Sequence, residues 1–139
     1  MKLKVPDLHL EGLQLVRVTL TPGMGPKEYD GQWVMFCSPL GSPGALVVSA
    51  DFHEVSEGVL LGGTAHAIVR SNDATTASQA GADEAAEVLG PWLSEVLWDF
   101  LAGYLLPLAA TSWGNFTLPQ KAPTPTIRHL AELGGSDKE

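Results

Sequence analysis

Hydrophobic and polar residues alternate along two neighbouring segments of the chain, 45–55 and 59–70. In the first, every second residue from Leu46 to Phe52 is apolar, whereas the residues between them include Asp51. A period of two is typical of strands with one buried face, and the short Gly-containing stretch between the segments favours a tight turn. The pattern predicts an antiparallel hairpin. We expect mostly buried side chains at Leu46, Val48, Phe52, Leu61 and Val69. The side chains of Asp51 and Arg70 should be exposed.

Residues 8–20 are rich in Leu, Val and Thr and lie between prolines, which predicts a strand with a bend at Gly12. Residues 21–44 are rich in Gly and Pro and predict a long irregular connection, in which the apolar residues 32–36 could form an edge strand. Burial of Trp33 and Phe36 should keep part of this connection ordered. Higher mobility is expected near residues 23–27.

The spacing of apolar residues becomes helical after residue 82. Acidic residues suit the first turn of a helix over 83–89, and Gly90-Pro91 is expected to end it. A second helix is predicted over 92–112, because apolar side chains recur there every four residues. The members of this stripe are Trp92, Val96, Phe100 and Tyr104.

Pro107 is expected to kink or end the second helix near Tyr104. A short amphipathic helix is predicted from residue 126, with a frayed tail over 134–139. Residues 71–82 are small and polar and suit either a linker or a weak strand. Strands followed by helices predict one α+β domain over 1–139, with an antiparallel sheet and a long crossover loop, packed by C-terminal helices on one face. The other face of the sheet is then exposed or available for dimerisation.

Composition narrows the classes of partner. The chain is 45% hydrophobic and has four Trp, which is more apolar surface than a small core needs and favours an apolar contact with another molecule. A net charge of −8 argues against nucleic acid and anionic membranes, and favours basic partners. The single Cys37 suits a reducing compartment. No signal peptide is recognisable, and Glu95, Asp99 and Pro107 interrupt the most apolar run, so we expect a cytoplasmic protein without membrane insertion.

Candidate chemistry is sparse. His53 and His66 fall on the polar face of the hairpin, where an acid–base or metal site is conceivable, although solvent-facing histidines are the commoner outcome. Cys37 lacks the surroundings of a nucleophile. The acidic residues Glu84, Glu87, Glu95 and Asp99 are interpreted as a solvated helix face. The sequence therefore predicts no enzyme, no cofactor and no metal site.

Residues 97–133 resemble the C-terminal part of the SecB chaperone family, in which a long helix is followed by a turn, an extended proline-containing arm and a last helix. Gly114 and Phe116 match the turn, and Leu118-Pro119 match the arm. Pro123 or Pro125, with Ile127, match the entry to the last helix. The family's order of strand, crossover loop, strands and helices fits the remainder of the chain.

The resemblance implies a holdase that keeps unfolded polypeptides in an apolar groove, without a reaction, for protein export or for one dedicated partner. The residues expected to bind such clients are Trp33, Met35, Phe36, Phe100 and Tyr104. A translocase component is a further expected partner. Two alternatives remain: an oligomeric interaction module without enzymatic activity, or a small-ligand-binding or enzymatic protein that uses His53 and His66.

The aromatic stripe of the predicted second helix and the edge of strand 8–20 would leave apolar surface on a monomer. Helix packing on the sheet accounts for part of the stripe, and a subunit contact or a binding groove for the rest. We therefore expect a homo-oligomer, a dimer or a dimer of dimers. Trp92 and Trp98 are the residues expected at its interface.

Overall fold

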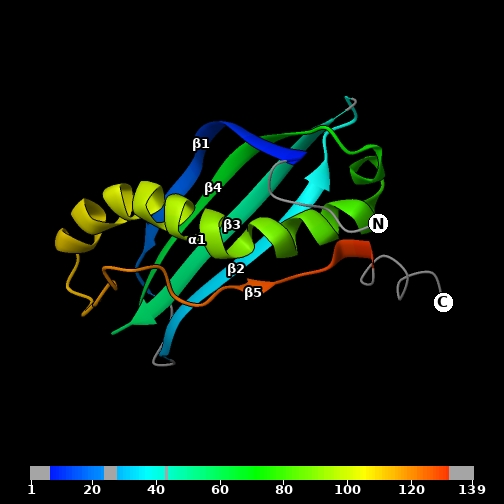
Figure 1. The fold of residues 1–139 in the computed structure, drawn as a ribbon. Coiled ribbons are helices and arrows are strands. Elements are labelled where there is room, and N and C mark those ends of the chain that lie inside the picture. Colours follow the sequence, from blue (N-terminus) through cyan, green and yellow to red (C-terminus); the bar gives the residue numbers. More distant parts are fainter. Residues whose placement is uncertain (1–6, 24–27, 43, 132–139) are drawn as a thin grey trace.

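The computed structural model describes residues 7–23, 28–42 and 44–131 of the chain. Figure 1 shows an α+β architecture, as predicted, in which one long helix crosses a twisted sheet. The elements, in chain order, are β1 (Leu8–Thr21), β2 (Tyr29–Pro39), β3 (Ala45–Ser56), β4 (Val59–Ser71), a 3-10 helix η2 (Ala74–Ala77), α1 (Gln79–Ala110) and β5 (Thr126–Ile127).

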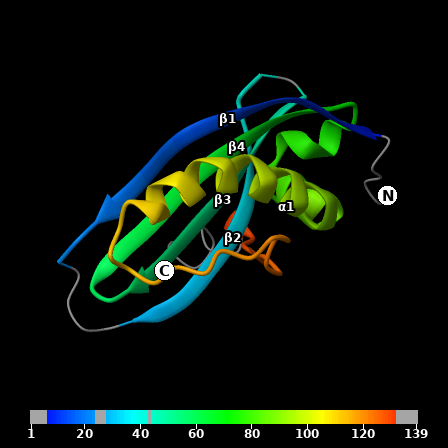
Figure 2. The ribbon, with the colours of Figure 1, turned by 90° about the vertical axis from the view of Figure 1, so that its left-hand side faces the viewer.

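The strands form one sheet in the order β1-β4-β3-β2-β5, with antiparallel pairing from β1 to β2 and a parallel pairing between β2 and β5. Helix α1 covers one face, and no helix of the described chain covers the other (Figure 2). In this order β1 and β2 lie on opposite sides of the β3–β4 hairpin. Higher mobility is expected near residues 23–27, but residues 24–27 lie outside the described residues.

The hairpin prediction is confirmed. Strands β3 and β4 pair antiparallel, and the turn residues Glu57 and Gly58 both have positive φ, at 51° and 77°, as a type I′ turn requires. Leu46, Val48, Phe52, Leu61 and Val69 are all buried. Arg70 is exposed, whereas Asp51 is only half-exposed because neighbouring side chains on the sheet contact it.

The prediction of a long irregular segment over 21–44, with at most an edge strand at 32–36, is wrong over residues 29–39. Residues Tyr29–Pro39 form β2, a strand in the interior of the sheet, with β3 on one side and the short β5 on the other. Trp33, Met35 and Cys37 point into the core at period two, and their burial outweighs the Gly and Pro that flank the strand. The expected bend at Gly12 is present as an irregularity of the β1–β4 pairing between Leu10 and Gly12.

The division into two helices is also wrong. Helix α1 is continuous from Gln79 to Ala110 and contains both Pro91 and Pro107. An internal proline costs about 3 kcal/mol. Leucines at every fourth position, however, remain buried on both sides of Pro91, and each contributes about 1.5–3 kcal/mol. These leucines are Leu89, Leu93, Leu97, Leu101 and Leu105.

The start of α1 lies within residues 71–82, for which the sequence suits either a linker or a weak strand. The Ser78 side chain accepts a hydrogen bond from the backbone N–H of Gly81, at 3.0 Å, and so caps the helix four residues before the expected start. Residues 71–82 thus supply the end of β4, η2 and the first turn of α1 rather than a further strand.

Helix α1 is long and apolar enough to cross a membrane by length and composition, with a mean hydropathy of 1.3 over its most apolar window. The interruptions noted in the sequence therefore do not shorten it. This window is 39% buried within the domain, and its leucine face contacts the sheet. A core helix of a folded domain has the same properties.

The centre of the core is aromatic. The Trp98 ring lies edge-on to Trp33, with ring centroids 5.2 Å apart, and to Phe52, at 5.0 Å. Both indole N–H groups are satisfied: Trp33 donates to Ser94 Oγ at 2.9 Å, and Trp98 to the carbonyl of Pro119 at 2.9 Å. The second of these bonds ties the core to the segment that follows α1.

That segment is extended, and the helix expected from residue 126 is not formed there. Thr126 and Ile127 form β5, beside Val34 and Met35 of β2. Helical residues begin at Leu130, and the frayed tail expected over 134–139 lies outside the described residues. We call residues 114–131 the C-terminal arm (orange to red in Figure 1).

Candidate functional site

The aromatic side chains proposed from the sequence separate into buried and accessible groups. Trp33, Met35 and Trp98 are core residues, with no more than 3% of their surface exposed. This corrects the expectation of accessible positions for them, because β2 is a strand under α1 and the Trp98 side of the helix faces the sheet. Phe36 and Phe100 are half-buried, and Tyr104 and Trp92 are exposed.

The accessible aromatics follow one line along α1. Trp92 is 50% exposed and Tyr104 is 45% exposed, with half-buried Val96 and Phe100 between them. The spacing of four residues keeps all four on one side of the helix, next to the buried leucine face. We call Trp92, Val96, Phe100 and Tyr104 the α1 ridge. The rings of Phe100 and Tyr104 pack edge to face at 5.5 Å, which presets the shape of this surface.

The C-terminal arm borders two hollows. One, of about 360 Å³, lies between α1 and the arm residues 122–127, with Pro91, Ser94 and Glu95 on the helix side. The other, of about 420 Å³, lies between the arm and the sheet, beside Phe52 and Glu54. Three prolines of the arm, at positions 119, 123 and 125, line these hollows. Because proline fixes its own φ, this stretch keeps its shape without a regular ladder of hydrogen bonds.

Acidic side chains of α1 hold the arm in place. The buried carboxylate of Asp83 accepts hydrogen bonds from the backbone N–H groups of Leu130 and Ala131, at 3.1 and 3.0 Å. Glu87 pairs with His129 at 2.7 Å, and Glu95 accepts a longer bond from the N–H of Ala122 at 3.4 Å. Glu87 and Glu95 are exposed, as expected of a solvated helix face, and their carboxylates also contact the arm. Asp83 anchors the start of the last helical turn.

The two edges of the sheet differ. On one side β5 pairs with β2 over Val34 and Met35 only, and Arg128 adds a hydrogen bond from its N–H to the carbonyl of Met35. On the other side β1 pairs with β4 and has no further strand beside it in the described part of the chain. An edge strand with unpaired N–H and C=O groups is a template for pairing with another chain.

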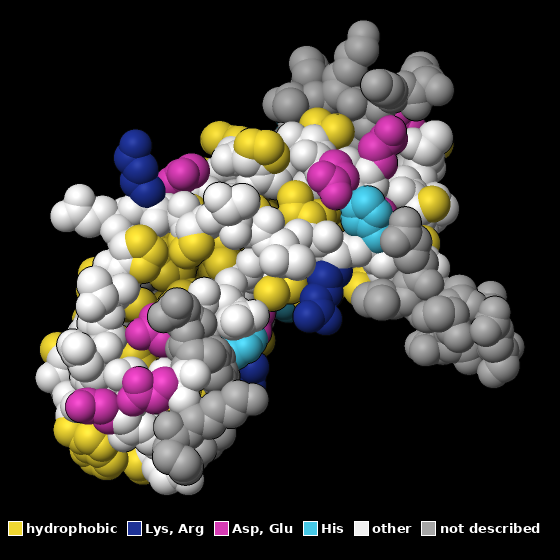
Figure 3. Space-filling view, turned by 90° about the horizontal axis from the view of Figure 1, so that it is seen from below, with side chains coloured by type: hydrophobic (Ala, Val, Ile, Leu, Met, Phe, Trp, Pro, Cys, Tyr) yellow, Lys and Arg dark blue, Asp and Glu magenta, His cyan; other side chains and the backbone are white. Residues whose placement is uncertain are grey.

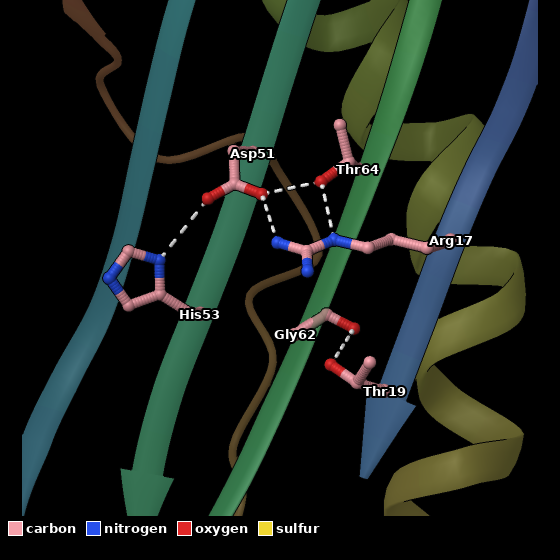
Figure 4. A network of polar contacts seen from close by, with 6 residues as sticks. All are labelled: Arg17, Thr19, Asp51, His53, Gly62 and Thr64. Atoms are coloured by element: carbon pink, nitrogen blue, oxygen red, sulfur yellow. Dashed lines mark hydrogen bonds and ion pairs between the residues drawn. The ribbon is translucent and has the colours of Figure 1, made fainter.

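Polar side chains gather in the middle of the uncovered sheet face (Figure 4). Arg17 Nε donates to Thr64 Oγ1 at 3.3 Å, and Thr64 Oγ1 donates to Asp51 Oδ1 at 2.6 Å. Arg17 Nη2 and His53 Nδ1 also face the Asp51 carboxylate, at 3.7 and 3.4 Å. We call Arg17, Asp51, His53 and Thr64 the open-face cluster.

The arrangement of the open-face cluster does not suit nucleophilic catalysis. In a hydroxyl–imidazole–carboxylate relay the imidazole lies between the other two groups and takes the proton from the hydroxyl. Here the Asp51 carboxylate lies between Thr64 and His53, so the hydroxyl donates directly to the carboxylate. Among the described residues there is no group of His, Cys, Asp or Glu that could hold a metal ion.

His53 and His66 do not form a shared site. His53 lies opposite Gly62 and His66 opposite Ser49, so four residues of β4 separate them along the strand. At about 3.3 Å per residue this is roughly 13 Å. Partial burial lowers the pKa of His66, which disfavours its charged form.

Cys37 is buried in the core beside the start of α1. Burial, with the nearby negative charge of Asp83, raises the pKa of its thiol to about 12. The reactive thiolate is therefore not formed near neutral pH. This agrees with the sequence interpretation that Cys37 is not a nucleophile.

No family model and no curated protein matches this chain. Among solved structures the chain is similar to a SecB-like chaperone of Mycobacterium tuberculosis, Rv1957, in complex with a ChAD peptide from the HigA1 antitoxin Rv1956. The similarity covers 82% of this chain and 89% of the other, at 16% sequence identity and a TM-score of 0.45. It concerns the arrangement of the elements. What this chain binds has to be argued from its own surfaces.

Proposed function

We propose that the protein is a holdase that binds extended segments of unfolded polypeptides without catalysing a reaction. The observation that carries this proposal is the α1 ridge, a line of large apolar side chains that stays accessible along the helix although the core is complete without it. Accessible apolar surface of this kind normally marks a binding site.

Phe100 and Tyr104 remain the proposed client-binding residues, now within the α1 ridge. Leu106, near the end of α1, and Trp113, just after it, are further exposed apolar side chains. An extended client would place alternate side chains on the α1 ridge. The hollow of about 360 Å³ beside Pro91 lies on the other flank of α1 and is a separate place for an apolar side chain. Binding of this kind requires no nucleotide or metal.

Homo-oligomer formation is part of the proposal. Strand β1, whose outer edge is unpaired in the described part of the chain, is fourteen residues long. Of Trp92 and Trp98, the two tryptophans expected at the interface, Trp92 is the exposed one. Two copies that pair through β1 would satisfy both edges by a two-fold axis. We therefore expect a dimer or a tetramer, and we place it in the cytoplasm. A mass measurement in solution tests the oligomeric state.

The range of clients is the least defined part of the function. The net charge of −8 favours clients, or a translocase component, with basic surface. General export and protection of one dedicated partner both fit these properties. Pull-down with a translocase subunit from the same source would distinguish these two roles.

The test is suppression of aggregation. Wild-type protein should reduce light scattering by an unfolded substrate, and a Tyr104→Ser, Trp113→Ser variant should require several-fold more protein for the same effect. Leu40→Ser is the matched control, because Leu40 is 48% exposed, close to Tyr104 at 45%, but lies at the β2–β3 turn. Native mass and unfolding should be unchanged in each variant.

Two results would contradict the proposal. One is a wild type that suppresses nothing even in large excess, which would leave an interaction module as the better description. The other is equal activity of wild type and the Tyr104→Ser, Trp113→Ser variant, which would place the clients elsewhere on the molecule.

A further inference from the structure

The uncovered face of the sheet contains a hollow that the α1 ridge does not reach. Its volume is about 330 Å³. Val34 and Phe36 of β2 supply the apolar part, and the open-face cluster and Arg128 supply the polar part. Figure 3 shows basic and histidine side chains beside the recess on this side of the molecule.

Arg128 reaches this face because of the short strand β5. Successive side chains of an extended segment point to opposite faces. Ile127 points to the helix side, where its Cδ1 would lie 2.6 Å from a Cβ at Gly90, so the absence of a side chain at Gly90 makes room for it. The N–H of Arg128 donates to the carbonyl of Met35 at 2.9 Å. The guanidinium of Arg128 is thereby directed to the open face.

The charges in the hollow are not balanced. Arg17 and Arg128 contribute two positive charges, and Asp51 contributes one negative charge, so the hollow is positive in a chain with a net charge of −8. Asp51 already interacts with Arg17, His53 and Thr64. Within residues 7–23, 28–42 and 44–131, the guanidinium of Arg128 has no hydrogen bond or ion pair.

We propose that this hollow binds an extended peptide segment in which an acidic residue lies two positions away from a large apolar residue. The carboxylate would contact the guanidinium of Arg128, with Arg17 nearby, and the apolar side chain would pack on Phe36 and Val34. A guanidinium donates two parallel hydrogen bonds to a carboxylate, which favours this ligand over a neutral amide. The inference rests on the proposed function and adds a class of sequence that the site selects.

A peptide suits the hollow better than a free small acid because an open strand edge lies beside the hollow. Beyond Val34 and Met35, the outer edge of β2 has no strand beside it in the described part of the chain, and Phe36 lies on this stretch. An extended peptide that pairs there would place every second side chain over the hollow. Phe36, expected from the sequence to bind clients, then does so on the opposite face from the α1 ridge.

Short acetylated and amidated peptides with a central Glu-Ala-Phe or Gln-Ala-Phe segment test the proposal by calorimetry. Wild type should bind the Glu-Ala-Phe peptide about tenfold more tightly, as one charge-assisted contact supports. Arg128→Gln should lose this preference. Arg70→Gln is the control, since it removes the same charge from an arginine paired with Glu11 elsewhere on the sheet, and should retain it.

Equal binding of the two peptides by wild type, or equal losses in both arginine variants, would overturn the inference. So would phenylpropionate that binds as tightly as the Glu-Ala-Phe peptide, because the occupant would then be a small acid. The proposed function is judged separately by scattering. A wild type that suppresses aggregation but does not discriminate the peptides refutes only the inference, whereas one that discriminates them without suppressing aggregation refutes only the holdase.

Discussion

Replacing Trp98 with alanine should strongly destabilise the protein. The side chain is completely buried, lies edge-on to Trp33 and Phe52, and donates a hydrogen bond to Pro119. Loss of a buried aromatic residue costs about 3–5 kcal/mol, and the two edge contacts place this site toward the upper end of that range. A domain of this size has a total stability of about 5–15 kcal/mol, so Trp98→Ala removes a large part of it.

Urea unfolding followed by circular dichroism measures this loss, at several protein concentrations because subunit association would add to the apparent stability. Trp113→Ala is the control: its side chain is 67% exposed, and its free energy of unfolding should change by less than about 1 kcal/mol. If Trp98→Ala lowers the free energy of unfolding by less than about 1 kcal/mol and also lowers the native mass, Trp98 lies in a subunit interface. The assignment of Trp98 to the core would then be wrong.

Three further predictions concern the same core. Ser94→Ala should cost about 1–3 kcal/mol in urea unfolding, because it leaves the indole N–H of Trp33 buried without an acceptor. Gly81→Ala should lower the melting temperature strongly, since a Cβ there would overlap the carbonyl oxygen of Thr75, and it should shift the start of α1. A thiol reagent at pH 8 should label Cys37 only on unfolding, because burial raises the pKa of this thiol to about 12; fast labelling of folded protein would contradict its burial.

The hairpin was predictable because its information is local. Strands β3 and β4 alternate at period two, and the Glu57-Gly58 turn has the residue that positive φ favours. Strand β2 was less visible, since its outward residues Val34 and Phe36 are apolar too. A strand with apolar residues on both sides loses the alternation by which strands are recognised.

Helix α1 shows the opposite error, in which a local signal was given too much weight. Gly90-Pro91 is a strong local stop, but only packing against the sheet reveals that leucines on both sides of it belong to one buried face. Gly90 serves the approach of Ile127, a residue far along the chain. Trp98 was misassigned for the same reason: its neighbours on the sheet come from β2 and β3 and cannot be identified from helical spacing.

The proline-rich arm follows from the same accounting of contacts. The backbone C=O groups within a helix already accept hydrogen bonds from the helix itself. They therefore cannot accept bonds from the N–H groups of an extended segment that lies on the helix. Prolines at 119, 123 and 125 remove donors from the arm, and carboxylates of α1 accept some of the others, at Ala122, Leu130 and Ala131. The acidic residues on this side of α1 are therefore the acceptors that a proline arm requires. Because the contacts depend on few side chains, the arm can border an apolar hollow without filling it, which is the property that a site for extended polypeptides needs.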